Sequence, residues 1–288
     1  MKVGNKILVI DGNNIAHRAL HAMGGMQFGG RPTGVIFGFL NVLGSNISQF
    51  KPKKVYICWD GSSNKQRLNL LLGYRRRDPK IGVDREALER QMNTLRIMMK
   101  SLGIPQLHAP YHEADDFIYG LTRKHEGENL IITSGDKDFR QLVTKKVWVF
   151  DERKGLITPL NFKRLFNLEP EQYADYLCLD GDESDKIPGC PGVGPVTALK
   201  ILHEYGSVEN YLATAPNGND KYDGIDRVFP INRTLINLSA FEEAFGKIEL
   251  QYYKGLEKPK KRIEKYIALC KKYGINKWRT PEFINKIP

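Results

Sequence analysis

The sequence predicts an α/β fold with a mainly parallel central sheet flanked by helices. Five short segments are apolar and mostly β-branched, as expected of strands that are buried on both faces. These segments are Lys6–Ile10, Lys54–Trp59, Gln106–Ala109, Asn129–Thr133 and Lys146–Phe150. Helical patterns separate them, and this alternation is typical of parallel sheets. Ligands of such sheets bind at the carboxyl ends of the strands.

Two segments between these strands have the spacing of long amphipathic helices. Apolar residues recur every three or four positions in Gly34–Phe50 and again in Arg85–Leu102. Gly103 ends the second pattern, and Pro105 follows it. We therefore predict two long helices that flank the sheet.

After Phe150 the pattern becomes mainly helical. Asp151–Gly155 is predicted to be a turn between two extended pieces. Helices are predicted at Pro159–Asn167, Pro170–Leu179 and Pro195–Tyr205. The polar stretch Thr214–Gly224 is rich in Gly and Asn and is predicted to be a loop. We expect two domains, an α/β core at residues 1–158 and a helical subdomain at residues 159–288.

The chain of 288 residues is basic, with 44 Lys and Arg against 33 Asp and Glu and a net charge of +11. An excess of this size indicates a polyanionic partner, nucleic acid before an anionic membrane. A basic surface that only confers solubility is the alternative. Residues 251–288 hold 11 Lys and Arg against 3 Asp and Glu, a net charge of +8, so most of the excess lies in this tail.

Composition excludes several classes of protein. With 41% apolar and 27% charged residues, the chain is predicted to be globular rather than disordered. No apolar run approaches the ~18 residues of a membrane span, and the first residues lack the pattern of a secretory signal. The four cysteines form no CxxC pair and no zinc-type spacing with His. We expect a monomeric cytoplasmic protein with reduced thiols and no membrane contact.

Acidic residues directly follow several predicted strands. Asp11 comes after the first strand and Asp60 after the second, while Asp136 and Asp138 follow NLIITSG. Because parallel strands end at the same edge of a sheet, these carboxylates are expected to gather there. Taken singly, an Asp after a strand is often only a turn residue.

Further carboxylates extend this set. Glu113, Asp115 and Asp116 open a predicted helix in HEADDFIYGL, where they could also be only caps. Asp182 and Asp185 follow in LDGDESDKIPG. Carboxylates in one cleft repel each other, and hard cations such as Mg²⁺ or Mn²⁺ remove that cost. Two such ions about 4 Å apart could clamp a phosphodiester. The combination with a basic surface predicts a nuclease.

Six stretches of sequence, in this order, resemble the 5′-nuclease or flap endonuclease family. They are IDGNNIAHRALHA, RPTGVIFGFLN, WDG, HEADD, TSGDKDFRQL and GDESDKIPGCPGVGPVTA, and they span roughly residues 7–205. The family includes the 5′-nuclease domain of bacterial DNA polymerase I and stand-alone phage 5′-exonucleases, and the chain is similar to the stand-alone form. The resemblance implies a PIN-like 5′-nuclease core, a helical arch at about 62–100 and a helix–two-turn–helix motif at about 170–206.

The resemblance also implies two Mg²⁺ or Mn²⁺ ions held by nine acidic residues. The first ion is assigned to Asp11, Asp60, Glu113 and Asp115. The second is assigned to Asp136, Asp138 and Asp182, with Asp115 bridging. Asp116 and Asp185 are expected to act through bound water. The catalytic set implied by the resemblance is Asp11, Asp60, Asp115, Asp136 and Arg75.

The segment PGCPGVGPVTALKILHEYG predicts a phosphate-binding turn. Gly192 and Gly194 permit a tight turn, and Pro195 suits the first turn of the next helix. Backbone amides at that helix start could bind a phosphate without reading sequence, although an ordinary helical corner would look the same. The resemblance implies duplex contacts and a K⁺ ion at this motif. The contacts are assigned to Gly192, Val193, Gly194, Thr197 and Lys200.

The basic segment KQRLNLLLGYRRRDPK is either a solvated face or a phosphate contact zone with a stacking platform. The resemblance places the arch here and implies DNA contacts by Arg67, Tyr74, Arg76 and Arg77. Family members usually carry Tyr-Lys at the base of the arch, whereas this chain has Tyr74-Arg75. Arg75 is therefore expected to stabilise the charge of the scissile phosphate.

His17 and Arg18 follow Asp11 by about two helical turns. A histidine at such a position is commonly a packing residue. The resemblance instead implies that His17 stacks on a base near the cut and that Arg18 contacts the region of the scissile phosphate.

These expectations combine into a metal-dependent, structure-specific 5′-3′ exonuclease and flap endonuclease. The expected substrates are DNA with a 5′ single-stranded flap or a 5′ end, and RNA paired to DNA, in primer removal or repair. A single-strand-binding or replication protein is a candidate partner. The alternatives are a PIN-like ribonuclease and a non-catalytic flap-binding protein.

Overall fold

The structure is a computed structural model that describes residues 5–61, 65–72, 74, 84–214, 222, 224–250 and 256–288. The chain divides into two compact units. The sheet unit comprises Met1–Ser62, Lys80–Gly135 and Glu249–Pro288, and the helical unit comprises Ser63–Pro79 and Asp136–Ile248.

Within the described part of the sheet unit, parallel strands form the sheet in the order β5 (Gln106–Leu107), β4 (Lys54–Cys58), β1 (Lys6–Asp11) and β6 (Asn129–Thr133). Asp11 pairs with Cys58, and Ile10 pairs with Thr133. The carboxyl ends of β1, β4 and β6 therefore lie level. The predicted strands are confirmed here, although the one at Gln106 is two residues shorter.

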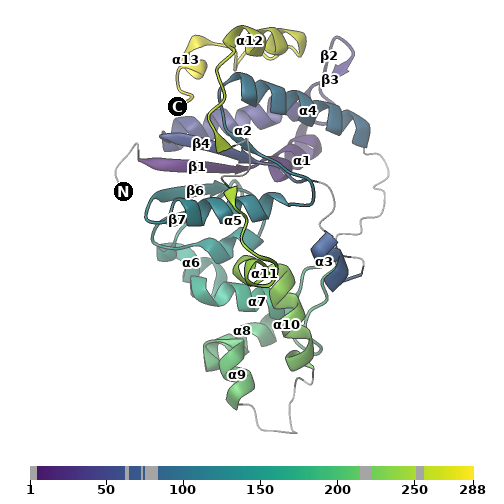
Figure 1. Ribbon diagram of the computed structural model, residues 1–288, viewed down its shortest axis with the longest axis vertical. Coiled ribbons are helices and arrows are strands. Elements are labelled where there is room, and N and C mark those ends of the chain that lie inside the picture. Colours follow the sequence, from purple (N-terminus) through teal and green to yellow (C-terminus); the bar gives the residue numbers. More distant parts are fainter. Residues whose placement is uncertain are drawn as a thin grey trace. The chain divides into compact units, whose positions relative to one another are not determined.

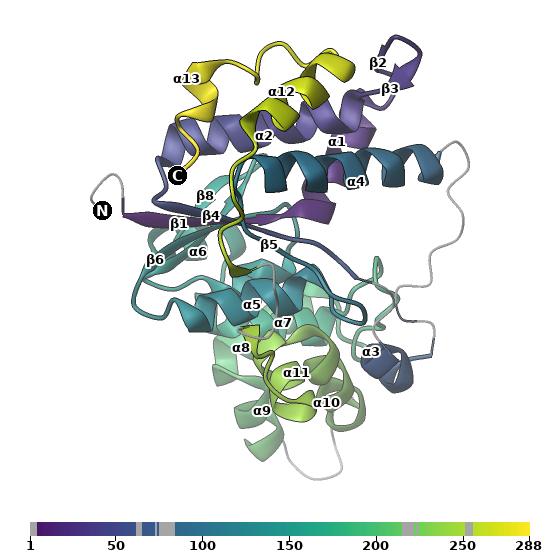
Figure 2. The same ribbon diagram turned by 45° about the horizontal axis from the view of Figure 1, so that its top comes forward.

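Helices cover both faces of this sheet. On one face lie α1 (Gly12–Met23), α2 (Gly34–Phe50) and α4 (Arg85–Ser101), and on the other lies α5 (Ala114–Lys124) (Figures 1 and 2). Because both faces are covered, the side chains from Ile7 to Ile10 are at most 1% exposed. The amphipathic spacing predicted α2 and α4 to within one residue.

Local sequence explains how α1 leaves the end of β1. Asp11 is both the last residue of β1 and the N-cap of α1, and its Oδ1 accepts a hydrogen bond from Asn14 N at 3.0 Å. Gly12 is required because a Cβ there would lie 2.4 Å from a ring carbon of Trp59. The chain therefore turns directly from strand to helix while Asp11 stays at the sheet edge.

The sheet unit also contains a short hairpin and a C-terminal segment. The hairpin pairs β2 (Gln27–Phe28) with β3 (Arg31–Pro32), and the C-terminal segment holds α12 (Ile263–Lys272) and α13 (Pro281–Ile284). The sequence-based division assigned this segment to the helical subdomain, whereas the structure groups it with the sheet.

Aromatic side chains explain this grouping. Trp278 Nε1 donates a hydrogen bond to Asn41 Oδ1 of α2 at 2.8 Å. The indole ring occupies the space beside Gly44, where a Cβ would lie 2.2 Å from a ring carbon. Tyr266 of α12 is fully buried, and its hydroxyl donates to Trp278 O at 2.8 Å. The charge of this segment gives no sign of these packing contacts, which depend on Trp278 and Tyr266 meeting residues distant in sequence.

The helical unit consists of one antiparallel hairpin and short helices, among the residues that the structure describes. In chain order these are α3 (Lys65–Leu70), the 3₁₀ helix η1 (Asp138–Leu142), β7 (Val147–Asp151), β8 (Gly155–Ile157), α6 (Pro159–Phe166), the 3₁₀ helix η2 (Pro170–Gln172), α7 (Tyr173–Asp180), α8 (Pro195–Tyr205), α9 (Val208–Thr214), α10 (Ile225–Ile236) and α11 (Leu238–Phe245).

The elements of the helical unit largely match the predictions. The turn between β7 and β8 and the helices α6 and α8 are confirmed. The helix predicted from Pro170 starts as η2 and continues as α7. Of the predicted loop, residues 215–221 and 223 lie outside the described residues. No described helix in either unit has the length and apolar character that crossing a membrane requires.

A buried asparagine holds the loop between α7 and α8. Asn232 of α10 is 1% exposed, and its Nδ2 donates to Cys178 O at 2.9 Å and to Pro188 O at 2.7 Å. These two bonds satisfy backbone oxygens at the end of α7 and in the loop that follows. The loop carries Asp182 and Asp185, so α10 helps to position them.

A half-buried carboxylate in α7 makes the stability of the helical unit depend on pH. Asp175 Oδ2 accepts a hydrogen bond from Val208 N at the start of α9 at 3.0 Å. Burial, followed in smaller part by the charge of Glu209, raises the pKa of Asp175 from 3.8 to about 6, although the Val208 bond and Arg233 oppose the rise. A raised carboxyl pKa stabilises the fold below pH 4, and that stabilisation is lost as the pH rises through 6.

Asp175→Asn is therefore expected to increase the free energy of unfolding at pH 8 and to leave it unchanged below pH 4. The gain should be about 1–3 kcal/mol, because the amide keeps an oxygen acceptor and avoids the buried charge. Urea unfolding at pH 4 and pH 8 measures this. The exposed Asp226→Asn is the matched control, and an equal gain in both variants would contradict the prediction.

Candidate metal centre

The first group of acidic residues lies in the sheet unit and is called the sheet-edge cluster here. Its members are Asp11, Asp60, Glu113, Asp115 and Asp116. Asp11 is the last residue of β1, and Asp60 is the second residue after β4. The other three lie at the start of α5. The level ends of β1 and β4, with the hydrogen bond from Ala114 N to Asp60, bring these segments to one edge of the sheet. The expected gathering of Asp136 and Asp138 at the same edge stays a prediction, because both belong to the helical unit.

Hydrogen bonds fix the orientation of Asp11. Its Oδ1 accepts from Asn14 N, and its Oδ2 accepts from Ser134 Oγ at 2.8 Å. Asn14 Oδ1 also accepts from Gly135 N at 3.0 Å. The start of α1 and the segment after β6 thus hold this carboxylate from two sides. Asp11 is only 4% exposed, so these hydrogen bonds take the place of water.

Asp60 joins the end of β4 to the start of α5. Its Oδ1 accepts a hydrogen bond from Ala114 N at 2.9 Å, and its backbone N donates to Asn13 Oδ1 at 3.2 Å. These two hydrogen bonds hold the Asp60 side chain against the start of α5 and its backbone against the start of α1.

Acidic residues at the start of α5 cap the helix and are also predicted metal ligands. Glu113 is the N-cap, and its backbone N donates to Asp116 Oδ2 at 2.9 Å as part of a capping box. Glu113, Asp115 and Asp116 are 6%, 8% and 9% exposed. Asp116 therefore has a structural role that the sequence analysis had given as the alternative.

The electrostatic effect of this cluster appears at Cys58, the last residue of β4. Burial raises the pKa of the Cys58 thiol well above its ordinary value, and the charges of Asp11, Asp115 and Asp60 raise it further. These three carboxylates thus create a strongly negative potential around a neutral thiol. Such a potential favours a bound cation.

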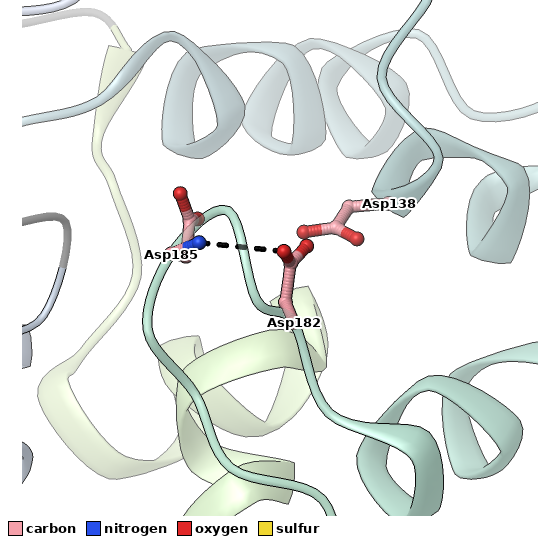
Figure 3. A group of neighbouring side chains, drawn as sticks. All are labelled: Asp138, Asp182 and Asp185. Carbon is pink, nitrogen blue, oxygen red and sulfur yellow. Dashed lines mark hydrogen bonds between the residues drawn. The ribbon is translucent and has the colours of Figure 1, made fainter. Parts of the chain in front are cut away.

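The second group, called the loop cluster, lies in the helical unit. Its members are Asp136, Asp138, Asp182 and Asp185. One oxygen each of Asp138, Asp182 and Asp185 lies within 4.8 Å of the other two. Figure 3 shows the carboxylates of Asp138 and Asp182 facing each other across a short gap. Spacings of this kind suit a single hard cation with oxygen ligands.

The loop itself orients Asp182. Its Oδ1 accepts hydrogen bonds from Ser184 N at 2.7 Å, from Ser184 Oγ at 2.6 Å and from Asp185 N at 3.3 Å, the last of which is drawn in Figure 3. Asp182 also forms a β-bridge with Ile187. On the other side of the cluster, Asp138 N donates to Asp136 Oδ1 at 3.0 Å.

Asp138 gives the clearest sign that the loop cluster fits a cation. Its Oδ1 is buried and has no hydrogen-bond partner among the described residues. Burial and the charges of Asp136, Asp182 and Asp185 raise the pKa of Asp138 well above its ordinary value. A divalent cation would satisfy the unpartnered oxygen and remove the repulsion.

Asp182 behaves differently from Asp138. Burial tends to raise the pKa of Asp182, but the hydrogen bonds from Ser184 and the charge of Lys137 together lower it below its ordinary value. Asp182 is therefore ionised at neutral pH. Lys137 Nζ lies 3.4 Å from Asp182 Oδ2.

Several residues that support these carboxylates escaped the sequence analysis. They are Asn13, Asn14, Ser134, Lys137 and Ser184. Each is one to three residues from a predicted ligand, so proximity to the acidic motifs was the available signal. Short polar side chains beside a ligand commonly orient it.

The predicted DNA contacts of the arch region have a mixed outcome. Arg75, Arg76 and Arg77 lie outside the described residues. Arg67 of α3 is 1% exposed, and its guanidinium carbon lies 3.8 Å from the centroid of the Phe241 ring. Arg67 therefore packs within the helical unit in this structure, and its DNA contact stays a prediction.

Three other predicted contacts stay predictions. Tyr74, expected to be a stacking platform, is only 6% exposed. His17 and Arg18 are half-buried on α1, and Arg18 lies beside Gly135, where a Cβ would be 3.2 Å from Nη1. Arg18 is thus close to the segment that leads into Asp136.

The predicted phosphate-binding turn begins α8. Gly192 has φ +72°, a conformation that glycine adopts without strain, and Gly194 is the N-cap before Pro195. Both glycines and Lys200 are exposed, Thr197 is half-buried, and the side chain of Val193 is buried. A Cβ at Gly194 would meet no atom within 4 Å, so the start of α8 is open, as phosphate binding at a helix N-terminus requires.

Comparison with known proteins decides the family. A family model described as "5'-3' exonuclease, N-terminal resolvase-like domain" matches residues 6–167, and one described as "5'-3' exonuclease, C-terminal SAM fold" matches residues 168–237. The chain belongs to the 5′-3′ exonuclease family. It is therefore an enzyme of the nuclease class, and its helical unit contains the SAM-like domain of that family.

Curated relatives agree with this assignment. The 5′-3′ exonuclease of Aquifex aeolicus is 35% identical over 210 residues, which cover 72% of this chain and 72% of that protein. The thermostable DNA polymerase I of Thermus aquaticus is 34% identical over 211 residues, which cover 72% of this chain and 25% of the polymerase. The exonuclease family thus includes separate proteins and parts of longer polymerases.

Two solved structures share the fold. T5 5′-exonuclease with bound zinc ions gives a TM-score of 0.68 at 20% identity, covering 82% of this chain and 90% of that chain. Flap endonuclease-1 from Methanococcus jannaschii gives 0.58 at 16% identity, covering 99% and 91%. These likenesses confirm the predicted α/β core with a helical C-terminal part.

Proposed function

We propose that this exonuclease uses two divalent cations, Mg²⁺ or Mn²⁺, to hydrolyse DNA near the junction of a 5′ single strand and a duplex. The observation that carries the proposal is the loop cluster, in which three carboxylates converge and a buried oxygen of Asp138 has no hydrogen-bond partner in the described part of the chain. Family membership supports the same activity. Each acidic cluster would hold one ion.

The chain's own residues supply ligands and orientation. In the sheet-edge cluster, Ser134 and Asn14 hold Asp11, and the start of α5 holds Asp60. In the loop cluster, the turn at Ser184 fixes Asp182. All of the candidate donors are oxygen atoms, which suits hard cations. Bound cations would activate a water molecule and stabilise the leaving oxygen.

The choice of substrate rests on the relatives and on charge. Flap endonuclease-1 and the polymerase I relatives support DNA with a 5′ flap or a 5′ end, and the net charge of +11 suits a polyanion. We propose that the exposed start of α8 binds a duplex phosphate and a K⁺ ion. RNA paired to DNA, a single-strand-binding or replication partner, a monomeric state and a cytoplasmic location belong to the same proposal.

A cleavage assay tests the proposal. End-labelled 5′-flap, nicked and circular DNA substrates are incubated with Mg²⁺, with Mn²⁺ and with a chelator. We expect cutting of flap and nicked DNA with either ion, no cutting of closed circles and no cutting with chelator. Cleavage of unstructured RNA in preference to flaps would instead support a PIN-like ribonuclease, and tight flap binding without cutting would support a non-catalytic protein.

The basic tail allows a separate prediction about duplex binding. Four neighbouring cations of the tail are Lys258, Lys260, Lys261 and Arg262. Lys258 Nζ donates a hydrogen bond to Pro288 O at 2.8 Å, and Lys261 Nζ donates one to Ile287 O at 3.1 Å. These two lysines bind backbone oxygens of the tail itself. All four side chains are exposed, but among the described residues Lys260 and Arg262 make no such bond to the backbone, so these two are expected to bind a phosphate.

Replacing Lys260 and Arg262 with alanine is expected to weaken binding of all duplex sequences alike. The slope of log K against log[salt] should shrink by roughly 0.9 for each lost phosphate contact. Fluorescence anisotropy across a salt series measures this slope. Lys258→Ala with Lys261→Ala is the matched control and should change the slope less. An unchanged slope in the first variant would identify the tail as a solvated surface.

A further inference from the structure

Lys137 lies between two members of the loop cluster in sequence and contacts a third in space. Its Nζ is 3.4 Å from Asp182 Oδ2 and donates a hydrogen bond to Gly181 O at 3.4 Å. The lysine side chain is 33% exposed, and that of Asp182 is 7% exposed. The ammonium group therefore reaches from the solvent side onto a largely buried carboxylate.

The contact falls on one particular oxygen of Asp182. Ser184 and Asp185 together donate three hydrogen bonds to Oδ1, at 2.6–3.3 Å. Oδ1 is thereby committed to the turn, and Oδ2 is the oxygen left for a ligand. Lys137 contacts Oδ2, so an ion that binds Asp182 through Oδ2 has to compete with the ammonium.

The charge balance of the cluster explains why a lysine is placed here. Asp136, Asp138, Asp182 and Asp185 carry up to four negative charges in a small space. The charge of Lys137 acts on both Asp138 and Asp182 and favours their ionised forms. One fixed positive charge offsets part of the repulsion, and the same charge opposes the approach of a divalent ion.

We propose that Lys137 is an internal counter-cation that competes with the divalent ion for Asp182 Oδ2 and thereby sets the metal affinity of the loop cluster. This inference rests on the proposed function, because it needs an ion at that cluster. Lys137 is a positioning residue that acts through Asp182. A purely structural role would make Lys137 important for stability and leave metal affinity unchanged.

Mn²⁺ binding to the full chain tests this inference without relying on cleavage. Free Mn²⁺ is measured by electron paramagnetic resonance during titration of the wild type, Lys137→Met and Lys145→Met. Lys145 is an exposed lysine of the helical unit, so its replacement makes the same charge change away from the cluster. Asp138→Asn identifies which binding step belongs to the loop cluster.

Lys137→Met is expected to bind Mn²⁺ at the loop cluster about tenfold or more tightly, because a repelling charge is removed within a few ångströms of the ion. Lys145→Met should stay within twofold of the wild type. Lys137→Gln, which can still donate to Gly181 O, should show the same tightening if Lys137→Met does not fold. Lys137→Arg should keep the wild-type affinity to within a few-fold.

The outcomes distinguish a failure of the role inferred for Lys137 from a failure of the proposed ion at the loop cluster. Unchanged or weaker Mn²⁺ binding in the neutral Lys137 variants overturns the inference alone, provided that the wild type binds Mn²⁺ and cuts flap DNA. A wild type without a binding step that Asp138→Asn removes overturns the proposed loop-cluster ion and this inference together. Tightening by Lys145→Met equal to that by Lys137→Met would also overturn it, since the effect would then be one of overall charge.

Discussion

Replacing Asp136 with asparagine is expected to lower the single-turnover cleavage rate by orders of magnitude while leaving the fold and DNA binding intact. The fold should persist because the amide keeps an oxygen that can accept the bond from Asp138 N, now 3.0 Å from Asp136 Oδ1. The rate should fall because the proposed second ion loses a charged ligand. Single-turnover cleavage of a 5′-flap substrate and a parallel binding titration measure the two effects. Near-normal turnover in saturating Mg²⁺ would refute the role assigned to Asp136.

Asp185→Asn provides a graded comparison for the same cluster. A carboxylate that acts through bound water typically costs about 10–100-fold when it is removed, so this variant should be milder than Asp136→Asn. The convergence of Asp185 with Asp138 and Asp182 within 4.8 Å makes the comparison informative. A loss as large as that of Asp136→Asn would reassign Asp185 as a direct ligand. Asp226→Asn, on an exposed part of α10, is the control for charge alone.

The second large effect is expected at Arg75, where family members that this chain resembles usually carry lysine. Negative charge develops on the phosphate oxygens in the transition state, and a preorganised cation there contributes several kcal/mol. An arginine supplies this charge through a planar fork and does not act as an acid near neutral pH. Arg75→Ala should therefore depress single-turnover cleavage strongly and change DNA affinity little.

Neighbouring arginines provide the control for this prediction. Arg75→Lys should retain substantial activity, because lysine restores the residue usual in the family. Arg76→Ala and Arg77→Ala should cleave within a few-fold of the wild type. The assignment fails if Arg75→Ala is nearly normal and one of the two neighbours collapses instead. These arginines lie outside the described residues, so the prediction rests on the chemistry and on the sequence motif.

The sheet edge could be predicted because its causes are local. Buried parallel strands are continuous apolar runs, and an acidic residue after such a run has to lie at the carboxyl edge. The location of Asp11 and Asp60 at this edge could therefore be predicted from their sequence positions alone. The helix that starts after Glu113 was also predictable, since acidic residues are favoured in a first helical turn.

The loop cluster could not be derived in the same way. Asp138 and Asp182 are far apart in sequence, and neither the spacing nor the hydropathy between them indicates that they meet. Only the motif resemblance assigned them to the same ion. The contact of Lys137 with Asp182 depends on which oxygen the Ser184 turn occupies, and a sequence carries no such geometric information. Arg67 shows that a basic run in the sequence does not guarantee exposed side chains, because its guanidinium packs on the ring of Phe241.

The insertion of Trp278 beside Gly44 has a consequence for how this protein is made. The sheet unit joins the first part of the chain to residues near its end, and the indole fills a space in α2 that was synthesised more than two hundred residues earlier. The ribosome synthesises the chain from its N-terminus onward, and domains generally fold as units. Most of the helical unit is therefore synthesised before the sheet unit is complete. The space beside Gly44 of α2 stays unfilled until Trp278 has been synthesised.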